Sequence, residues 1–257
     1  MTGSAPLHWP PKYDLFGAMI SATDYEQAEE LIIEAARRKM AAVVSHLPVH
    51  SIVTAWRDES YRRSINAFEI AAPDGQPVRW ALNRIHGLRL RDRVYGPELM
   101  LRLCRRAARE GIGIYLYGST HEVLRRLERN LCAMCPGLII AGTESPPFGQ
   151  MTEEEDAAAV RRINASGAGI VFIGLGCPKQ DFYAAAHRHS IRAVQVCVGA
   201  AFDFHAGTKP MAPRWMQRAG LEWLFRLISE PRRLWRRYAV NNTLFLLLLA
   251  RRLLLRR

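Results

Sequence analysis

The sequence lacks the cysteine pattern of a disulfide-stapled protein. It has five cysteines, an odd number without framework spacing, and a lone Cys-x-x-Cys pair at Cys132 and Cys135. A zinc site of the usual kind would need a second such pair, which is missing. We therefore predict reduced thiols in a cytosolic environment and no structural zinc.

Long apolar runs are also missing. The longest, Leu244–Ala250, is far shorter than the roughly 20 residues that a helix needs to span a bilayer. The N-terminus has no basic start followed by an apolar run, which a secretion signal would show. We expect neither a transmembrane span nor a secretion signal.

Metal and dinucleotide motifs are absent as well. The chain contains no Asp-x-Asp pair and no His-Glu-x-x-His, and Asp203-x-His205 is the nearest approach to a metal pattern. The glycine turn at Gly174 and Gly176 lacks the third glycine of a dinucleotide fingerprint, and no acidic residue stands at ribose spacing. A nicotinamide dehydrogenase is thus a weak alternative, and we predict no metal and no cofactor.

Acidic residues are scarce in one part of the chain. Residues 206–257 hold twelve basic side chains, eleven of them arginines, against only Glu222 and Glu230, a net charge of +10. The other 205 residues carry 24 basic and 22 acidic side chains, or +2. The asymmetry predicts an almost neutral domain over residues 13–205 and a basic appendage over residues 206–257. The appendage calls for an anionic partner: nucleic acid, anionic lipid or a phosphorylated substrate.

Strands and helices alternate regularly through the neutral domain. Helical spacing and capping residues predict helices from Thr23 or Asp24 to Ala35 and at His50–Trp56, Pro97–Glu110, His121–Cys132 and Thr152–Ser166. Short apolar strands are expected at Leu15–Ile20, Met40–Val44, Ala67–Ala71, Ile112–Tyr117, Leu138–Ala141, Ile170–Ile173 and Ala193–Val198. This order predicts an α/β, Rossmann-like parallel sheet with helices on both faces.

The appendage is expected to form amphipathic helices. Leu221–Ile228 and Leu234–Tyr238 are separated by Pro231, which should break or kink the run. If the helical phase continues through the proline, Arg226, Arg233 and Arg237 lie within about 40° of one another. The apolar side chains then lie broadly opposite, at Leu224, Ile228, Trp235 and Tyr238.

Beyond these helices, leucines alternate with pairs of arginines up to the end of the chain. Arginine with tryptophan and leucine on an amphipathic segment favours a position in the membrane interface. The alternative is a helix that docks on the core through its leucines and leaves its arginines in solvent.

Candidate site residues follow the expected strand ends. In a sheet of this kind, ligands bind outside the carboxyl ends of the strands. A strand, glycine turn and helix at Ile170–Tyr183 would leave free backbone N–H groups at the helix start, where a phosphate can bind. Asp74 stands in a Pro-Asp-Gly sequence that also fits a plain type I turn. The residues collected in this way are Ser45, His46, Asp74, Gly75, Tyr117, Gly118, Thr143, Glu144, Gly174, Gly176, Lys179, Gln180, Gly199, Asp203 and His205.

An ordered set of short motifs spans most of the chain. It comprises PDG at 73–75, DRVYG at 92–96, YGS at 117–119, GTESPPFG at 142–149, GLGCPKQDFY at 174–183, VGAAFDFHAG at 198–207 and GLEWLFRLISEPRRLWRRY at 220–238. In this order and over about residues 13–240, the chain resembles the bacterial WecG/TagA/CpsF glycosyltransferases.

The resemblance implies an inverting, metal-independent transfer of a sugar from a UDP-sugar donor, of the N-acetylmannosamine type or a relative, to a polyprenyl-diphosphate-linked sugar. The reaction would take place at the cytoplasmic face of the bacterial inner membrane, with the protein bound peripherally. It would serve cell-envelope or exopolysaccharide synthesis. The anionic membrane surface, reached through the appendage, becomes an expected partner, and nucleic acid does not.

The resemblance also assigns roles. Asp74 matches the proposed general base, and Arg93 and Gln180 match residues that hold the nucleotide or the reacting sugar. Arginines of the appendage would neutralise diphosphate: Arg226, Arg233, and Arg236 or Arg237. Together with the strand-end residues, the predicted substrate contacts are Ser45, Arg93, Tyr117, Gly118, Gly174, Gly176, Lys179, Gln180, Asp203, Arg226, Arg233, Arg236 and Arg237.

Two departures from the family pattern keep a second class of function open. Ser45-His46-Leu47 stands where members carry Thr-x-Asn, and Met211-Ala212-Pro213 replaces Arg-Ala-Pro. Each change removes a polar side chain that could contact a sugar. The alternative is a non-catalytic, membrane-associated subunit of a polysaccharide assembly complex, and a nucleic-acid binder is a distant third. The sequence leaves open whether copies of the chain form a homo-oligomer.

Overall fold

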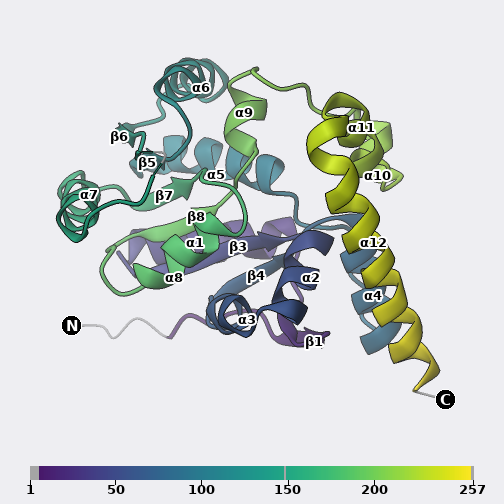
Figure 1. The fold of residues 1–257 in the computed structure, drawn as a ribbon. Coiled ribbons are helices and arrows are strands. Elements are labelled where there is room, and N and C mark those ends of the chain that lie inside the picture. The colour runs from purple at the N-terminus through teal and green to yellow at the C-terminus, as the bar shows by residue number, and fades with distance from the viewer. Residues whose placement is uncertain (1–5, 148, 256–257) are drawn as a thin grey trace.

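The computed structural model describes residues 6–147 and 149–255. Phe148 of the GTESPPFG motif and the arginines at 256 and 257 lie outside the described residues. Six strands form a parallel sheet in the order β4-β3-β8-β7-β5-β6, and β1 and β2 form a separate antiparallel hairpin (Figure 1). The strands are β1 Lys12–Leu15, β2 Ala18–Ser21, β3 Ala42–Leu47, β4 Ile70–Pro73, β5 Ile114–Tyr117, β6 Ile140–Glu144, β7 Ile170–Ile173 and β8 Val194–Cys197.

The central strands are buried on both sides because both faces of the sheet are covered. In β7, Ile170 and Phe172 pack into one core, and Val171 and Ile173 pack into the other. The first core includes α1 Tyr25–Arg37, α5 Gly96–Glu110, α6 His121–Met134 and α9 Ala201–His205. The second includes α2 Val49–Arg57, α3 Glu59–Asn66, α4 Gln76–His86, α7 Glu153–Ala165 and α8 Lys179–Ala186. The predicted α/β fold is confirmed.

The predicted strand Leu15–Ile20 is wrong. The chain turns at Phe16 and Gly17, both with positive φ, and pairs Leu15 with Ala18 in a tight hairpin. The Asp14 carboxylate accepts a hydrogen bond of 2.8 Å from the Gly17 N–H and closes the turn. Apolar residues on both sides of one glycine had hidden this turn.

Two helices on either side of β4 in the sequence were not predicted. α3 begins after Asp58, whose carboxylate caps the Tyr61 N–H, so the following strand starts at Ile70 and not at Ala67. α4 begins directly after Gly75, whose φ of 87° takes the chain from strand to helix. The plain turn at Pro-Asp-Gly is therefore a βα junction, and Asp74 lies at the carboxyl end of β4.

Three smaller differences concern strand ends and caps. β3 extends to Leu47, which places Ser45 and His46 inside the sheet. β6 includes the first three residues of the motif at 142–149. The predicted capping box at the start of α7 is confirmed, with Thr152 and Glu155 bonding each other's backbone N–H groups.

The appendage consists of helices that dock on the domain. They are α10 Arg214–Arg218, α11 Glu222–Ser229 and α12 Pro231–Leu254. Figure 1 shows α12, in yellow, lying alongside α4 with α11 above its start. Phe245 is buried in the second core, and partly buried leucines of α12 pack against it. Docking through the apolar face, the alternative considered from the sequence, is what the structure shows.

The break at Pro231 is confirmed, since Glu230 leaves helical geometry and Pro231 starts a new helix. The condition for a common helical phase of Arg226, Arg233 and Arg237 is therefore not met. A second face of α12 stays in solvent, with Leu246, Leu247 and Leu254 exposed. In residues 6–147 and 149–255, no helix is both long and apolar enough to cross a membrane.

Candidate active site

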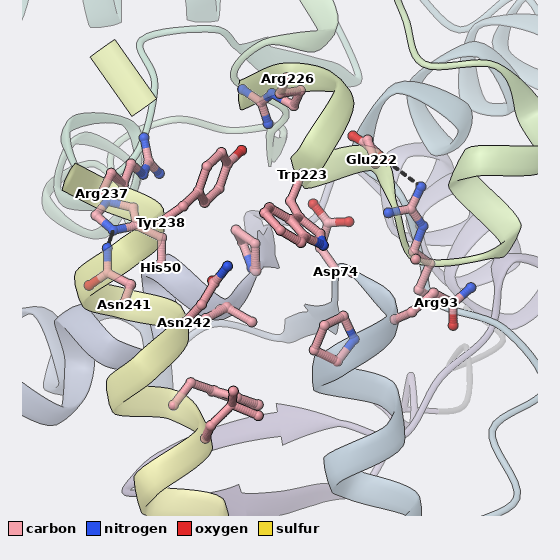
Figure 2. Close-up of a pocket in the computed structure, with 18 residues that line it drawn as sticks. His50, Asp74, Arg93, Glu222, Trp223, Arg226, Arg237, Tyr238, Asn241 and Asn242 are labelled. Atoms are coloured by element: carbon pink, nitrogen blue, oxygen red, sulfur yellow. Dashed lines mark hydrogen bonds and ion pairs between the residues drawn. The ribbon is translucent and has the colours of Figure 1, made fainter. Parts of the chain in front are cut away.

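A cavity opens where the carboxyl end of β4 meets the appendage. We call it the Asp74 cavity. Its walls come from α2, α4, the loop before α5, α11 and α12, so the domain and the appendage both contribute. The residues around it are Pro48, Val49, His50, Asp74, Gly75, Gln76, Pro77, Arg93, Gly220, Glu222, Trp223, Arg226, Arg237, Tyr238, Asn241, Asn242, Phe245 and Leu246 (Figure 2).

Asp74 is fixed by the backbone on both sides of it. Its N–H donates to the Leu47 carbonyl on β3 at 3.3 Å, and the preceding Pro73 carbonyl accepts from the Val94 N–H at 2.9 Å. The second bond holds the loop that carries Arg93 against the end of β4. The sheet therefore brings residues 74 and 93 together, although a whole helix separates them in sequence.

Arg93 forms a buried ion pair with the appendage. Its guanidinium donates to a carboxylate oxygen of Glu222 on α11 at 2.5 Å, and both side chains are almost fully buried. The ring of Tyr95 lies under the guanidinium, 4.3 Å from its centre. The pair ties α11 to the loop before α5.

Asp74 has the electrostatics of a base suited to neutral pH. Burial raises the pKa of this carboxyl to about 6, against the opposing effect of Arg93. The Glu222 carboxylate raises it further, and Arg226 lowers it. A carboxylate with such a pKa is ionised at pH 7 and accepts a proton more readily than an ordinary aspartate.

Cationic and neutral polar groups surround Asp74. Figure 2 shows Arg237, His50 and Asn241 on one side of Asp74, and Arg93 and Glu222 on the other. Burial lowers the pKa of His50 to about 4, and Arg237 acts in the same direction, so this imidazole is neutral at pH 7. The Asn241 amide lies 3.1 Å from His50 Nδ1.

The model of the glycosyl transferase WecG/TagA/CpsF family matches residues 13–257. The chain belongs to this family. It is accordingly a glycosyltransferase, which needs a sugar donor and an acceptor, and the cavity between domain and appendage offers room for reacting groups beside a carboxylate.

The structure brings together four of the residues predicted for the glycosyltransferase site. Asp74, Arg93, Arg226 and Arg237 all line the cavity. Arg233 and Arg236 do not, and Arg233 pairs with Glu230 at 2.5 Å on the surface. Arg237 belongs to the same helix, α12, as Arg233 and Arg236, and the break at Glu230 separates all three from Arg226 on α11.

The glycine residues of the sheet edge have a packing reason of their own. A Cβ on Gly118 would lie 2.8 Å from the Gly174 backbone, and one on Gly174 would lie 2.5 Å from the Phe202 ring. Gly176 has a φ of 79° and open space around it. These glycines lie outside the Asp74 cavity, at the ends of β5 and β7.

Polar residues at the start of α8 close the glycine turn. The Gln180 side chain is buried and accepts a hydrogen bond of 3.2 Å from the Gly176 N–H. Lys179 is exposed, beside that turn. Ser45 lies buried in β3 and donates to Asp181 of α8 at 2.5 Å, so it links the sheet to the same helix.

The remaining predicted substrate contacts also lie away from the cavity. Tyr117 is buried in β5 and stacks on Tyr183, and Asp203 binds Lys209 and Thr208. Of the two departures from the family pattern, Leu47 is fully buried and Met211 is partly exposed. Neither lines the Asp74 cavity.

Sequence reasoning missed the neutral and acidic half of this cavity. The missed polar and aromatic residues are His50, Glu222, Trp223, Tyr238, Asn241 and Asn242. Tyr238 was expected opposite the arginines, but it lines the same cavity as Arg226 and Arg237. Glu222 offered a signal, since it is one of only two acids in a strongly basic segment.

Across the described part of the chain, no group of three or more histidine, cysteine, aspartate or glutamate side chains is arranged to hold a metal ion.

Proposed function

We propose that this glycosyltransferase moves an N-acetylmannosamine-type or related hexose from a UDP-sugar to a polyprenyl-diphosphate-linked sugar, with inversion and without a metal. The observation that carries the proposal is the half-buried Asp74 carboxylate, set in a cavity with Arg226 and Arg237. A base and diphosphate-binding cations are the two kinds of group that such a transfer requires.

In the proposed reaction, Asp74 takes the proton from the acceptor hydroxyl while the oxygen of that hydroxyl attacks the anomeric carbon of the donor. The bond from that carbon to the UDP oxygen breaks, and UDP leaves with the electron pair. Attack opposite to the leaving group inverts the anomeric centre. The raised pKa of Asp74 favours the proton transfer at neutral pH.

Arg226 and Arg237 come from two different helices of the appendage and flank the cavity. Their charge would stabilise the diphosphate as it leaves, or hold the diphosphate of the lipid acceptor. Guanidinium groups suit both tasks because they bind two oxygens of a phosphate at once.

The protein is proposed to act at the cytoplasmic face of the bacterial inner membrane, in cell-envelope or exopolysaccharide synthesis. Exposed Leu246 and Leu247 lie on the same helix as Arg251 and Arg252, the combination that favours the interface of an anionic membrane. A lipid-linked acceptor would then reach the cavity from the side on which the appendage docks.

The test is a panel of UDP-sugars with a short polyprenyl-diphosphoryl-sugar acceptor and purified protein. With the right donor, we expect Asp74→Asn to lower kcat at least about 100-fold. Asp24→Asn is the matched control, because Asp24 only caps α1 and asparagine caps equally well. If no donor supports transfer by the wild type, or if Asp74→Asn matches it, the proposal fails and the non-catalytic subunit becomes the better explanation.

A further inference from the structure

One buried ion pair joins the two parts of the protein beside the proposed base. Glu222 of α11 binds Arg93 at 2.5 Å, and the exposed fractions of their side chains are 10% and 7%. Burying two charges is costly, and one replaced partner leaves the other unpaired. The ion pair is not needed to anchor the appendage, since Phe245 of α12 is already buried in the core. Its free-energy cost therefore points to another role.

Two carboxylates, those of Asp74 and Glu222, lie near the Arg93 guanidinium. The hydrogen bond from Val94 to the Pro73 carbonyl holds its loop against the end of β4, so Asp74 lies within its electrostatic reach. The guanidinium hydrogen-bonds to Glu222 and has no hydrogen bond to Asp74 among the described contacts. A guanidinium bonded directly to Asp74 would hold that carboxylate as an ion and weaken it as a base.

We propose that Glu222 is a positioning residue of the active site: by binding Arg93 it prevents that guanidinium from neutralising Asp74, and so keeps Asp74 able to accept a proton. This role rests on the proposed function, because it takes Asp74 as the base. The appendage, a segment rich in arginine, would then also contribute a carboxylate, that of Glu222, to the active site.

The charges that face Asp74 support this role. The neighbouring titratable and charged groups are Arg93 and Asp92 in the loop before α5, Tyr95, Tyr25 of α1, Glu222 and Arg226 of α11, His50 of α2, and Arg237 and Tyr238 of α12. Burial raises the pKa of Asp74, and Glu222 is the carboxylate that raises it further against Arg93 and Arg226. Loss of the Glu222 charge removes a repulsion and frees Arg93 for Asp74, and both effects lower that pKa.

The arrangement couples docking of the appendage to the strength of the base. Glu222 reaches Arg93 only while α11 packs beside the end of β4. When α11 is in place, the cavity also gains Arg226 from the same helix. The packing of α11 therefore supplies both Arg226, a cation that could bind diphosphate, and Glu222, which keeps Asp74 able to accept a proton.

The experiment compares wild type, Glu222→Gln and Glu222→Asp in the pH dependence of kcat/KM. Glutamine keeps the shape of the side chain and loses the charge, so the acid limb should move to lower pH by about half a unit or more. Aspartate keeps the charge on a shorter side chain and should give a midpoint between the other two. Glu230→Gln is the matched control, because Glu230 pairs with Arg233 on the surface of the same segment and should leave the midpoint in place.

A second readout needs no substrate. The titration of the Asp74 carboxyl carbon, followed by NMR in protein labelled with [¹³C]aspartate and assigned with Asp74→Asn, should show the same downward shift in Glu222→Gln. Circular dichroism checks folding, and if Glu222→Gln does not fold, the smaller shift of Glu222→Asp carries the test.

The outcomes separate the two proposals. An unchanged Asp74 midpoint in both Glu222 variants overturns the role of Glu222, even if activity falls equally at every pH, since that is what a purely structural pair would give. A shifted midpoint in a protein without transferase activity supports the electrostatic arrangement and overturns only the proposed function.

Discussion

Asp74, the proposed base, lowers the stability of the fold when its carboxyl is ionised. Burial raises its pKa from 3.8 to about 6, so the folded protein binds this proton more tightly than the unfolded chain does. The free energy of unfolding that Asp74 contributes is therefore fully present below pH 3.8 and falls as pH rises to about 6. At neutral pH the ionised form works against folding.

Asp74→Asn should accordingly stabilise the protein, although the proposed function predicts that it lowers kcat. We expect a gain of about 1–2 kcal/mol at neutral pH, because one pKa unit corresponds to about 1.4 kcal/mol and partial exposure reduces the effect. Urea unfolding of both proteins below and above this pH window measures it. A difference between them that is independent of pH would contradict the assignment of the raised pKa.

The Asp181 carboxylate, in contrast to Asp74, has a structural role. It is buried beneath the glycine turn, and it accepts hydrogen bonds from Ser45 at 2.5 Å and from Tyr61 at 2.8 Å. Burial raises its pKa, although these bonds oppose the rise. The cluster ties β3, α3 and α8 together at one point.

Removal of either hydroxyl should destabilise the fold. Tyr61→Phe and Ser45→Ala each remove one hydrogen bond to a buried carboxylate, at a cost of about 1–3 kcal/mol. Urea denaturation is the measurement. If Ser45→Ala leaves stability unchanged and weakens donor binding, then Ser45 serves the substrate, as the sequence had suggested, and not the fold.

At the scale of elements, α12 has two faces with different tasks. Phe245 is buried at the joint with the second core, whereas its neighbour Leu246 is 62% exposed. The two residues are adjacent in sequence and differ in direction because a helix turns by about 100° per residue.

Alanine substitutions at these neighbours should therefore separate the two faces. Phe245→Ala leaves a cavity in the core and should cost about 3 kcal/mol of stability, whereas Leu246→Ala should stay within about 0.5 kcal/mol. Thermal or urea unfolding of the two variants checks this. Equal costs would mean that α12 is docked in a different rotation about its axis.

The elements also show what sequence patterns can predict. Buried strands such as β7 were placed correctly, since an apolar run of four with a glycine turn reports burial on both faces. The hairpin at Phe16 and Gly17 and the start of α4 at Gly75 were missed. In both places a positive φ lets the chain turn without a change in hydrophobic pattern.

At the scale of the whole molecule, charge is segregated. Residues 206–257 carry a net charge of +10 out of the +12 of the chain, and exposed leucines lie among these cations. Anionic lipid attracts such a segment through charge and retains it through apolar contact.

We expect the protein to bind vesicles that contain anionic lipid, and to bind them less tightly as salt rises. Replacement of Leu246 and Leu247 by serine should weaken this binding several-fold. Ile139→Ser, at another exposed apolar residue outside the appendage, should leave it unchanged. Vesicle flotation measures the binding of the wild type and of both variants. Binding to neutral vesicles at high salt that equals binding to anionic vesicles at low salt would contradict the role of charge.

The sequence by itself determined the fold class, the family and the uneven charge, because these depend on local periodicity, on motif order and on composition. It also singled out Asp74, Arg93, Arg226 and Arg237. Only the tertiary structure decided which charges meet. Asp74, Arg93 and Glu222 come together because the appendage packs against the end of β4. Arg226 of α11 and Arg237 of α12 both line the cavity, whereas Arg233 of α12 pairs with Glu230 on the surface. No periodicity along one helix reports such a contact, since its strength depends on burial between elements distant in sequence.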